Sequence, residues 1–189
     1  AVLSGSLNFI FDSFNDEVKF VDIVKQAMQG GYTEPDPRID LSGTDVKRKI
    51  LILARESGYE LEMQDIASLE FLPETCRNKK DVDSFLKELD KNQEHFTKLF
   101  LDAQKEKAKL KFAASFVAEN KNSFKASVGL EKVDMNNDFY HLSGSDNIVL
   151  IYTDRYRENP LVIKGAGAGA DVTASGIVGD IIRSGNHLE

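Results

Sequence analysis

The sequence predicts an α+β fold: helices pack on one face of a mostly antiparallel sheet, and a glycine-rich turn with one last helix follows at the C-terminus. Three observations lead to this class. Apolar residues at helical spacing fill the first third of the chain, segments with partial alternation follow, and glycines then precede a final apolar helix. The 189 residues, 41% of them hydrophobic, suffice for one domain with its own core.

The first two helices are expected at residues 4–14 and 18–28, where apolar residues recur every three or four positions. Gly30 and Gly31 follow the second of these segments directly. Because glycine is a poor helix former and is common just past helix ends, this pair is expected to end the helix.

An extended loop is expected over residues 31–42. It contains Pro35 and Pro37, and each proline forces the residue before it out of the helical region. Ser42 is then the expected N-cap of a helix that stops at Gly58, because a serine side chain can accept a hydrogen bond from the first helical turn.

The middle of the chain is expected to form the sheet. Valine, phenylalanine and alanine partly alternate with polar residues in two segments separated by turn residues 120–122, which indicates an antiparallel hairpin. Two charged surface helices precede this hairpin. The expected strands are residues 69–72, 111–119, 123–132, 147–154 and 161–164, and the expected surface helices are residues 81–89 and 96–107.

A glycine-rich turn closes the chain. Gly165, Gly167 and Gly169 precede a helix that is expected to begin near residues 171–173. Backbone amides at such a turn can approach a phosphate or a nicotinamide, but a tight structural turn explains the same pattern equally well. The run is not a phosphate-binding Walker motif, because no Gly-Lys-Ser or Gly-Lys-Thr follows it.

Composition narrows the classes of partner. The 31 acidic and 24 basic residues give a formal charge of −7, the wrong sign for a protein that neutralises nucleic-acid phosphates, so a small-molecule ligand is expected. Cys76 is the only cysteine, which excludes an internal disulfide and favours a reducing, cytoplasmic location. The longest apolar stretches are too short to cross a membrane. His95, His141 and His187 lack metal-ligand spacing, so no metal is expected and each is interpreted as a surface residue.

The segment with the most chemical content combines an acidic loop with a charged helix. Asp45 and Lys49 are four residues apart and therefore share one helix face, beside an apolar stripe that would place them at the edge of the buried surface. A lysine there can be partly removed from water and act as an acid. A solvated ion pair explains the same spacing, but the prolines beside Glu34 and Asp36 would fix several carboxylates near one lysine, which suits a ligand with an amino group.

This segment, residues 31–55 with the sequence GYTEPDPRIDLSGTDVKRKILILAR, resembles the signature of homoserine dehydrogenases, GYTEPDPRxDLxGxDVARK. The segments LSGSLNFIF, LILARESG and NPLVIKGAGAGADVTASG are also similar to that family, so the resemblance covers essentially the whole chain. It is strongest to the C-terminal part of bifunctional aspartokinase/homoserine dehydrogenases. Two departures are visible: Ile39 replaces a more usual acidic residue, and Lys47 stands where the signature has alanine.

The resemblance implies an oxidoreductase that interconverts aspartate semialdehyde and homoserine with NAD or NADP. It implies that Lys49 donates the proton to the aldehyde oxygen, that Asp40 shapes the charge of this lysine, and that Glu34 and Asp45 hold the substrate amino group. Tyr32, Gly5 and Ser6 match further positions lining the substrate pocket, and Gly167 and Gly169 match positions near the cofactor.

The resemblance also implies that the chain is a fragment. Residues 1–164 are expected to form the substrate-binding, catalytic and dimerisation region, and residues 165–187 to belong to a nucleotide-binding domain whose main cofactor site lies upstream. The missing initiator Met and the final Leu-Glu agree with an excised piece. Apolar residues on both faces of strands 112–118 and 126–130 predict a homodimer through the sheet. The alternative is a non-catalytic module that binds an amine or only dimerises.

Overall fold

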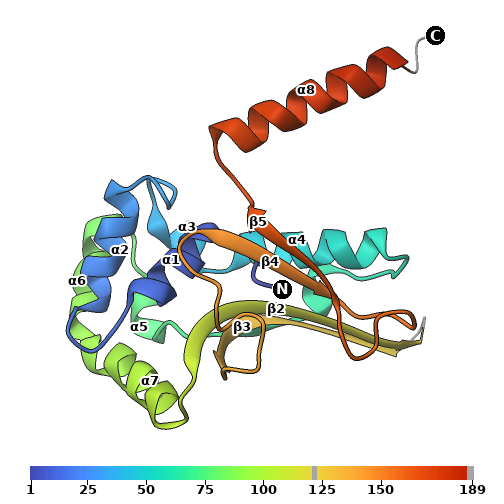
Figure 1. Ribbon diagram of the computed structural model, residues 1–189. Coiled ribbons are helices and arrows are strands. Elements are labelled where there is room, and N and C mark those ends of the chain that lie inside the picture. The colour runs from blue at the N-terminus through green and yellow to red at the C-terminus, as the bar shows by residue number, and fades with distance from the viewer. Residues whose placement is uncertain (121–122, 187–189) are drawn as a thin grey trace.

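Two β-sheets lie at the centre of the fold in the computed structural model, which describes residues 1–120 and 123–186 (Figure 1). The larger sheet has the strand order β1-β3-β2, and the smaller sheet pairs β4 with β5. The pairs β2–β3 and β4–β5 are antiparallel, whereas β1 runs parallel to β3. The strands are β1 Ile66–Leu69, β2 Lys109–Asn120, β3 Ser123–Val133, β4 Asp146–Ile151 and β5 Leu161–Ala166.

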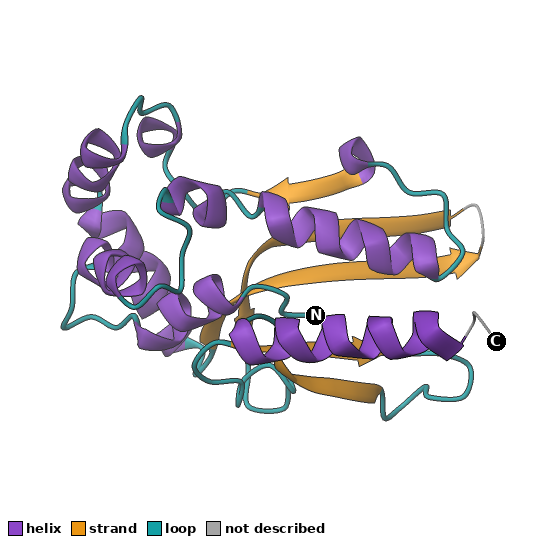
Figure 2. Ribbon diagram, turned by 90° about the horizontal axis from the view of Figure 1, so that it is seen from above, coloured by secondary structure: helices purple, strands orange, loops and turns teal. Residues whose placement is uncertain are grey.

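The helices complete an α+β architecture, so the expected class is confirmed. Seen from above, most of them gather at one end of the strands (Figure 2). Among the described helices, none is long and apolar enough to cross a membrane. The helices are α1 Gly5–Ser13, α2 Phe20–Gln29, α3 Pro37–Leu41, α4 Thr44–Glu56, α5 Glu74–Arg77, α6 Val82–Lys91, α7 Gln93–Lys105 and α8 Ala170–Asn186, with one 3-10 turn at Met63–Asp65.

The main core lies between the helices and one face of the β2–β3 hairpin. Phe112 and Val128 point from the hairpin into this core, where Phe20 stacks on Phe96 with ring centroids 4.1 Å apart. The other face of β2 contributes to a second, smaller cluster, which is formed by Val2, Ala113, Val133, Phe139, Leu142 and Ile148. The hairpin is therefore covered on both sides near its Lys109 end.

The loop between α2 and α4 is not fully extended as expected. Asp36 caps a five-residue helix, α3, by accepting a hydrogen bond from the amide of Arg38 at 3.1 Å. Pro37 occupies the first turn of α3, where proline has no helical hydrogen bond to lose. The two prolines therefore allow a short helix, which begins at Pro37.

Ser42 is not the N-cap of α4, because it ends α3 instead. The N-cap is Gly43, with φ of 67°, in the left-handed region that favours glycine. A Cβ atom at this position would lie 2.5 Å from Cζ of Phe112. The close approach of α4 to the sheet therefore selects glycine over a residue with a capping side chain.

The strand expected at residues 69–72 is also placed wrongly, since β1 covers Ile66–Leu69. Phe71 and Leu72, whose apolar side chains suggested a strand, lie buried in the core outside any strand. The parallel pairing of β1 with β3, the helix α5 and the 3-10 turn were not expected. The two surface helices are confirmed as α6 and α7, although each buries apolar residues of the core.

The last helix stands apart from the rest of the fold (Figure 1). No residue of α8 is buried, and its exposed apolar side chains are Val172, Ile177, Val178, Ile181 and Ile182. The strand before it is exposed along its length. The C-terminal part of the chain therefore presents an apolar surface that no described element covers.

Candidate active site

One cavity of about 610 Å³ brings together the expected site residues. Five separate segments line it: the start of α1, the loop after α2, the α3–α4 region, the start of β4 and the glycine-rich turn. The lining residues are Ser4, Gly5, Ser6, Gly30, Gly31, Tyr32, Thr33, Glu34, Asp40, Asp45, Lys49, Ser145, Asn147, Gly167, Ala168 and Gly169. Every residue expected to be catalytic, substrate-binding or cofactor-binding is among them, whereas the Asp36 carboxylate pairs with Arg38 and does not line the cavity.

Lys49 projects from α4 and is held by two acceptors. Its Nζ donates a hydrogen bond to the carbonyl oxygen of Leu3 at 2.9 Å and pairs with Oδ2 of Asp45 at 2.7 Å. The side chains of Lys49 and Asp45 are 39% and 55% exposed, so water screens the pair and it contributes little to stability. Its effect is to orient the ammonium at the cavity wall.

Asp40, on α3, uses both carboxylate oxygens to join two walls of the cavity. Oδ1 accepts a hydrogen bond from the Ser6 hydroxyl at 2.8 Å, and Oδ2 accepts one from the amide of Glu34 at 2.9 Å. Since the Ser6 proton points to Asp40, the hydroxyl of Ser4 must donate in the 2.9 Å contact between the two serines. Ser4 in turn caps α1 by accepting from the amide of Leu7. The α1 N-terminus and the acidic loop are thereby linked.

Tyr32 and Glu34 lie on the loop after α2. The ring of Tyr32 stacks on Phe9 with centroids 4.3 Å apart and stays half exposed. The Glu34 side chain is exposed, and no described residue pairs with its carboxylate. Three carboxylates, those of Glu34, Asp40 and Asp45, therefore face one lysine, and this excess of negative charge favours a ligand with a cationic group.

Four polar residues of the cavity were missed by the sequence analysis: Ser4, Thr33, Ser145 and Asn147. Oγ1 of Thr33 and Oδ1 of Asn147 are buried and have no hydrogen-bond partner among the described residues. Such atoms in a cavity wall are suited to receive a ligand donor, since an unpaired buried acceptor is costly. For Ser145 and Asn147 the available signal was the polar run SGSDN at residues 143–147, which leads into the apolar part of β4.

The glycine-rich turn packs against this wall. A Cβ atom at Gly167 would lie 1.9 Å from Nδ2 of Asn147, so only glycine fits there. Gly169 has φ of 122°, and a Cβ atom added to it would meet nothing within 4 Å, which leaves its backbone open on one side. The turn therefore contacts Asn147 closely at Gly167 and leaves space for a ligand at Gly169.

Comparison with known proteins decides the family. The sequence model of the homoserine dehydrogenase family matches residues 1–182. The chain belongs to the homoserine dehydrogenase family.

Two relatives and one solved structure show the extent of the similarity to other members. The chain is 42% identical to the bifunctional aspartokinase/homoserine dehydrogenase 2 of Zea mays, over 99% of this chain and 20% of the relative. It is 43% identical to the homoserine dehydrogenase of Saccharomyces cerevisiae, over 99% of this chain and 52% of the relative. A Candida auris protein described as of unknown function has a similar structure, with 41% identity and a TM-score of 0.85 over 96% of this chain and 51% of that one. The chain thus spans between a fifth and about half of the length of these relatives.

The two departures from the homoserine dehydrogenase signature lie outside the cavity. The side chain of Ile39 is exposed, and Lys47 lines a separate cavity of about 290 Å³ together with Arg38, Arg77 and Cys76. Lys47 precedes Lys49 by two residues, so the two side chains leave α4 on different sides. Neither departure changes a group that faces the candidate active site.

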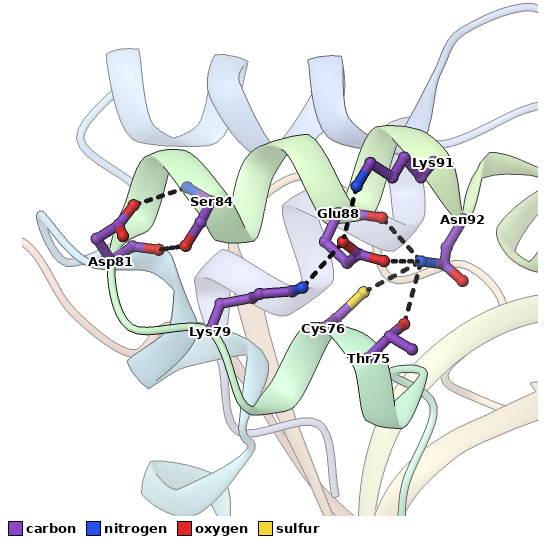
Figure 3. Close-up of polar contacts among 8 residues, drawn as sticks. All are labelled: Thr75, Cys76, Lys79, Asp81, Ser84, Glu88, Lys91 and Asn92. Carbon is purple, nitrogen blue, oxygen red and sulfur yellow. Dashed lines mark hydrogen bonds and ion pairs between the residues drawn. The ribbon is translucent and has the colours of Figure 1, made fainter.

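Cys76, His95 and His141 do not line the candidate active site. The Cys76 thiol is buried beside Asn92, whose Nδ2 lies 3.7 Å from Sγ, in a cluster where Glu88 pairs with Lys79 at 3.0 Å and Lys91 at 3.3 Å (Figure 3). Burial raises the pKa of this thiol, which keeps it protonated and unreactive. His95 and His141 are exposed, and His187, like residues 121 and 122 of the expected hairpin turn, lies outside the described residues. In the described part of the chain, no group of three or more His, Cys, Asp or Glu side chains is placed to hold a metal ion.

Proposed function

We propose that this chain is the substrate-binding and catalytic region of an enzyme that reduces aspartate semialdehyde to homoserine with NADH or NADPH. The observation that carries the proposal is the placement of Lys49. Its ammonium is fixed by Leu3 and Asp45 at the wall of a cavity that also holds three carboxylates, and the substrate offers one aldehyde oxygen and one ammonium group.

Lys49 acts as the general acid in this proposal. Its Nζ donates a proton to the carbonyl oxygen while the aldehyde carbon gains hydride, so that the carbonyl becomes the hydroxyl of homoserine. Asp45 keeps the lysine oriented and shares its negative charge with the substrate ammonium. Glu34 provides the second carboxylate for that ammonium, and Asp40 keeps Glu34 in place through its amide. Tyr32, Gly5 and Ser6 form the surrounding wall.

The residues beside the glycine-rich turn fit a nicotinamide. The unpaired Oδ1 of Asn147 can accept a hydrogen bond from a carboxamide. Gly167 lets the turn approach Asn147 closely, and Gly169 leaves the backbone of the turn open on one side. A reduced nicotinamide supplies the hydride when it is bound. The rest of the cofactor requires a βαβ unit, which we place outside this chain, with residues 1–164 as the catalytic region and residues 165–187 as a contribution to the nucleotide-binding domain.

We further propose that the parent protein is a homodimer that works in a reducing compartment such as the cytoplasm. Support for a dimer comes from exposed apolar side chains on the sheets, above all Val117 on β2 and Leu161, Val162 and Ile163 on β5. Support for the compartment comes from the single, buried cysteine. The Zea mays relative is named as chloroplastic, so that relative is assigned to a different compartment.

Oxidation of homoserine by the intact parent protein tests the proposal. We expect formation of NADH or NADPH, followed by its absorbance, and loss of this activity in Lys49→Ala. Lys47→Ala, on another side of the same helix, is the matched control and should keep the activity. A folded parent protein that binds an amine but turns over neither cofactor would instead favour the non-catalytic binding module.

A further inference from the structure

A buried lysine outside the candidate active site organises the cavity wall formed by residues 142–147. Lys111, on β2, is fully buried with 0% of its side chain exposed. Its Nζ donates hydrogen bonds to Oδ1 of Asn8 at 2.9 Å, to Oδ1 of Asp12 at 3.2 Å and to the carbonyl oxygen of Leu142. Burying an ammonium costs free energy unless its protons find acceptors. The Lys111 ammonium has one acceptor for each of its three protons.

Asn8 and Asp12 extend these contacts to the same loop. The side-chain Nδ2 of Asn8 donates to the carbonyl oxygens of Gly144 at 2.9 Å and Asp146 at 3.3 Å. Oδ2 of Asp12 accepts a hydrogen bond from the amide of Gly144 at 3.1 Å. Lys111, Asn8 and Asp12, called here the Lys111 cluster, therefore bind four backbone atoms of residues 142–146.

This loop carries part of the cavity wall. Ser145 lies within it and Asn147 follows it, and both line the cavity beside Gly5 and Gly167. The loop packs tightly against the start of α1, because a Cβ atom at Gly5 would lie 2.7 Å from the carbonyl oxygen of Ser145. A displacement of the loop would therefore alter the contacts of both the substrate wall and the glycine-rich turn.

We propose that Lys111 is a positioning residue for the active site, which in its charged form holds the loop of residues 142–146 against α1 and so places Ser145 and Asn147. The proposal rests on the proposed function for its kinetic test. The charge matters because an ammonium has three donors for the three acceptors, whereas a neutral amine has only two. Loss of the proton would leave one acceptor unpaired and release part of the loop.

The groups around Lys111 determine when it loses this proton. Burial lowers the pKa of Lys111, and the nearby carboxylate of Asp12 opposes that effect through its charge and its hydrogen bond. Lys109 on the same strand lowers the pKa further, and Glu131 lies opposite Lys111 in the β2–β3 pairing. Lys111 therefore loses its proton at a lower pH than an ordinary lysine does, and the removal of the Asp12 charge should lower that pH again.

The test uses the intact parent enzyme with the variants Asp12→Asn, Lys111→Arg and Lys111→Met. For Asp12→Asn we expect the alkaline limb of the pH profile of kcat/KM to move to lower pH. We also expect KM for homoserine to rise by about tenfold at neutral pH, and peptides covering residues 142–147 to exchange their amide hydrogens faster. Lys111→Arg keeps its charge throughout, so it should restore the alkaline activity that Lys111→Met loses. Lys125→Met, an exposed lysine on β3, is the matched control and should leave all three measurements unchanged.

The outcomes distinguish a failure of the positioning role of Lys111 from a failure of the proposed function. A folded Asp12→Asn enzyme with an unmoved alkaline limb and unchanged exchange in residues 142–147 would overturn the positioning role, and this holds even if Lys111→Met fails to fold. A wild-type parent that does not oxidise homoserine would defeat the proposed function instead. In that case the exchange measurement alone still decides whether the Lys111 cluster holds the loop.

Discussion

At the scale of single residues, the site separates groups that contact a ligand from groups that hold other residues in place. Lys49 and Glu34 present charged atoms to the cavity, whereas both oxygens of Asp40 are occupied by Ser6 and the amide of Glu34. We therefore assign Asp40 an indirect role, through the loop that it fixes. The two kinds of residue should differ in kinetics: loss of a ligand contact changes one step, and loss of a support changes several.

Lys49→Ala in the intact enzyme should lower kcat by about a hundred- to ten-thousandfold, the usual contribution of a general acid, while KM for homoserine changes much less. Steady-state kinetics at a fixed, saturating concentration of cofactor measures both constants. Lys47→Ala is the control. A loss in kcat below about threefold would show that another group supplies the proton.

Glu34→Gln should mainly weaken substrate binding. The carboxylate contributes through its charge and takes no part in bond making, so we expect KM for homoserine to rise by about tenfold with kcat nearly unchanged. Glu60→Gln, an exposed position after α4, controls for the general loss of one negative charge. An unaltered KM in Glu34→Gln would remove this residue from the binding site.

At the scale of secondary structure elements, the junction of α3 and α4 sets the position of Lys49, the proposed general acid. Gly43→Ala should destabilise the fold, because it combines a left-handed backbone with a clash against Phe112. Gly58→Ala shares the positive φ but has nothing within 4 Å of the added atom, so it isolates the backbone cost of about 1 kcal/mol. Urea unfolding should show that Gly43→Ala costs about 1–3 kcal/mol more than this control. Equal effects would mean that the Phe112 ring moves aside freely.

Elements with a local signature could be predicted from the sequence, and elements that depend on distant contacts could not. The hairpin and the helices α1, α2 and α6 follow from periodicity within each segment. The parallel strand β1 has no local signature, because its partner β3 lies about sixty residues further along the chain. At Gly43, a capping preference read from Ser42 was overruled by the approach of Phe112.

The candidate site divides in the same way. Tyr32 to Lys49 could be predicted because one continuous segment contains them and matches a family signature. Ser145 and Asn147 lie about one hundred residues later, beside backbone atoms that the Lys111 cluster contacts next to α1. No spacing rule relates these positions, so their role becomes visible only in three dimensions.

At the scale of the whole molecule, the amino group of Ala1 links the stability of the 189-residue chain to pH. The ammonium of Ala1 donates a hydrogen bond to the carbonyl oxygen of Ala114 at 2.7 Å, and burial lowers its pKa to about 6, against an opposing effect of Glu131. Because the unfolded ammonium has a pKa near 8.0, the unfolded chain binds more protons between about pH 6 and pH 8. The free energy of unfolding should therefore rise with pH across this window, by about 2–3 kcal/mol in total.

Urea unfolding of the 189-residue chain at pH 5.5 and at pH 8.5 checks this linkage. The same chain with an acetylated Ala1 is the control, since it has no ammonium to titrate while the exposed histidines remain. The pH dependence should be smaller in the acetylated chain by the stated amount. Equal pH dependence in both chains would show that the ammonium of Ala1 stays hydrated in the fold.

The exposed C-terminal helix leads to a prediction about cofactor binding. The described chain offers one glycine-rich turn but no βαβ unit for a pyrophosphate, so calorimetric titration should show much weaker binding of NADPH to this chain than to the parent protein. The apolar side chains of α8 should become protected only in the parent. Comparable affinities would place the whole nucleotide site within these 189 residues.

Two of the five segments that line the cavity come from opposite ends of the chain, namely residues 4–6 and residues 167–169. Both walls are peripheral in the sequence, whereas the apolar core lies largely between them. Removal of residues 1–6, or of residues 167–189, would open the cavity without removing a strand of the larger sheet. Proteolytic trimming at the C-terminal end would therefore remove a wall of the ligand site while every strand of the larger sheet stays in the chain.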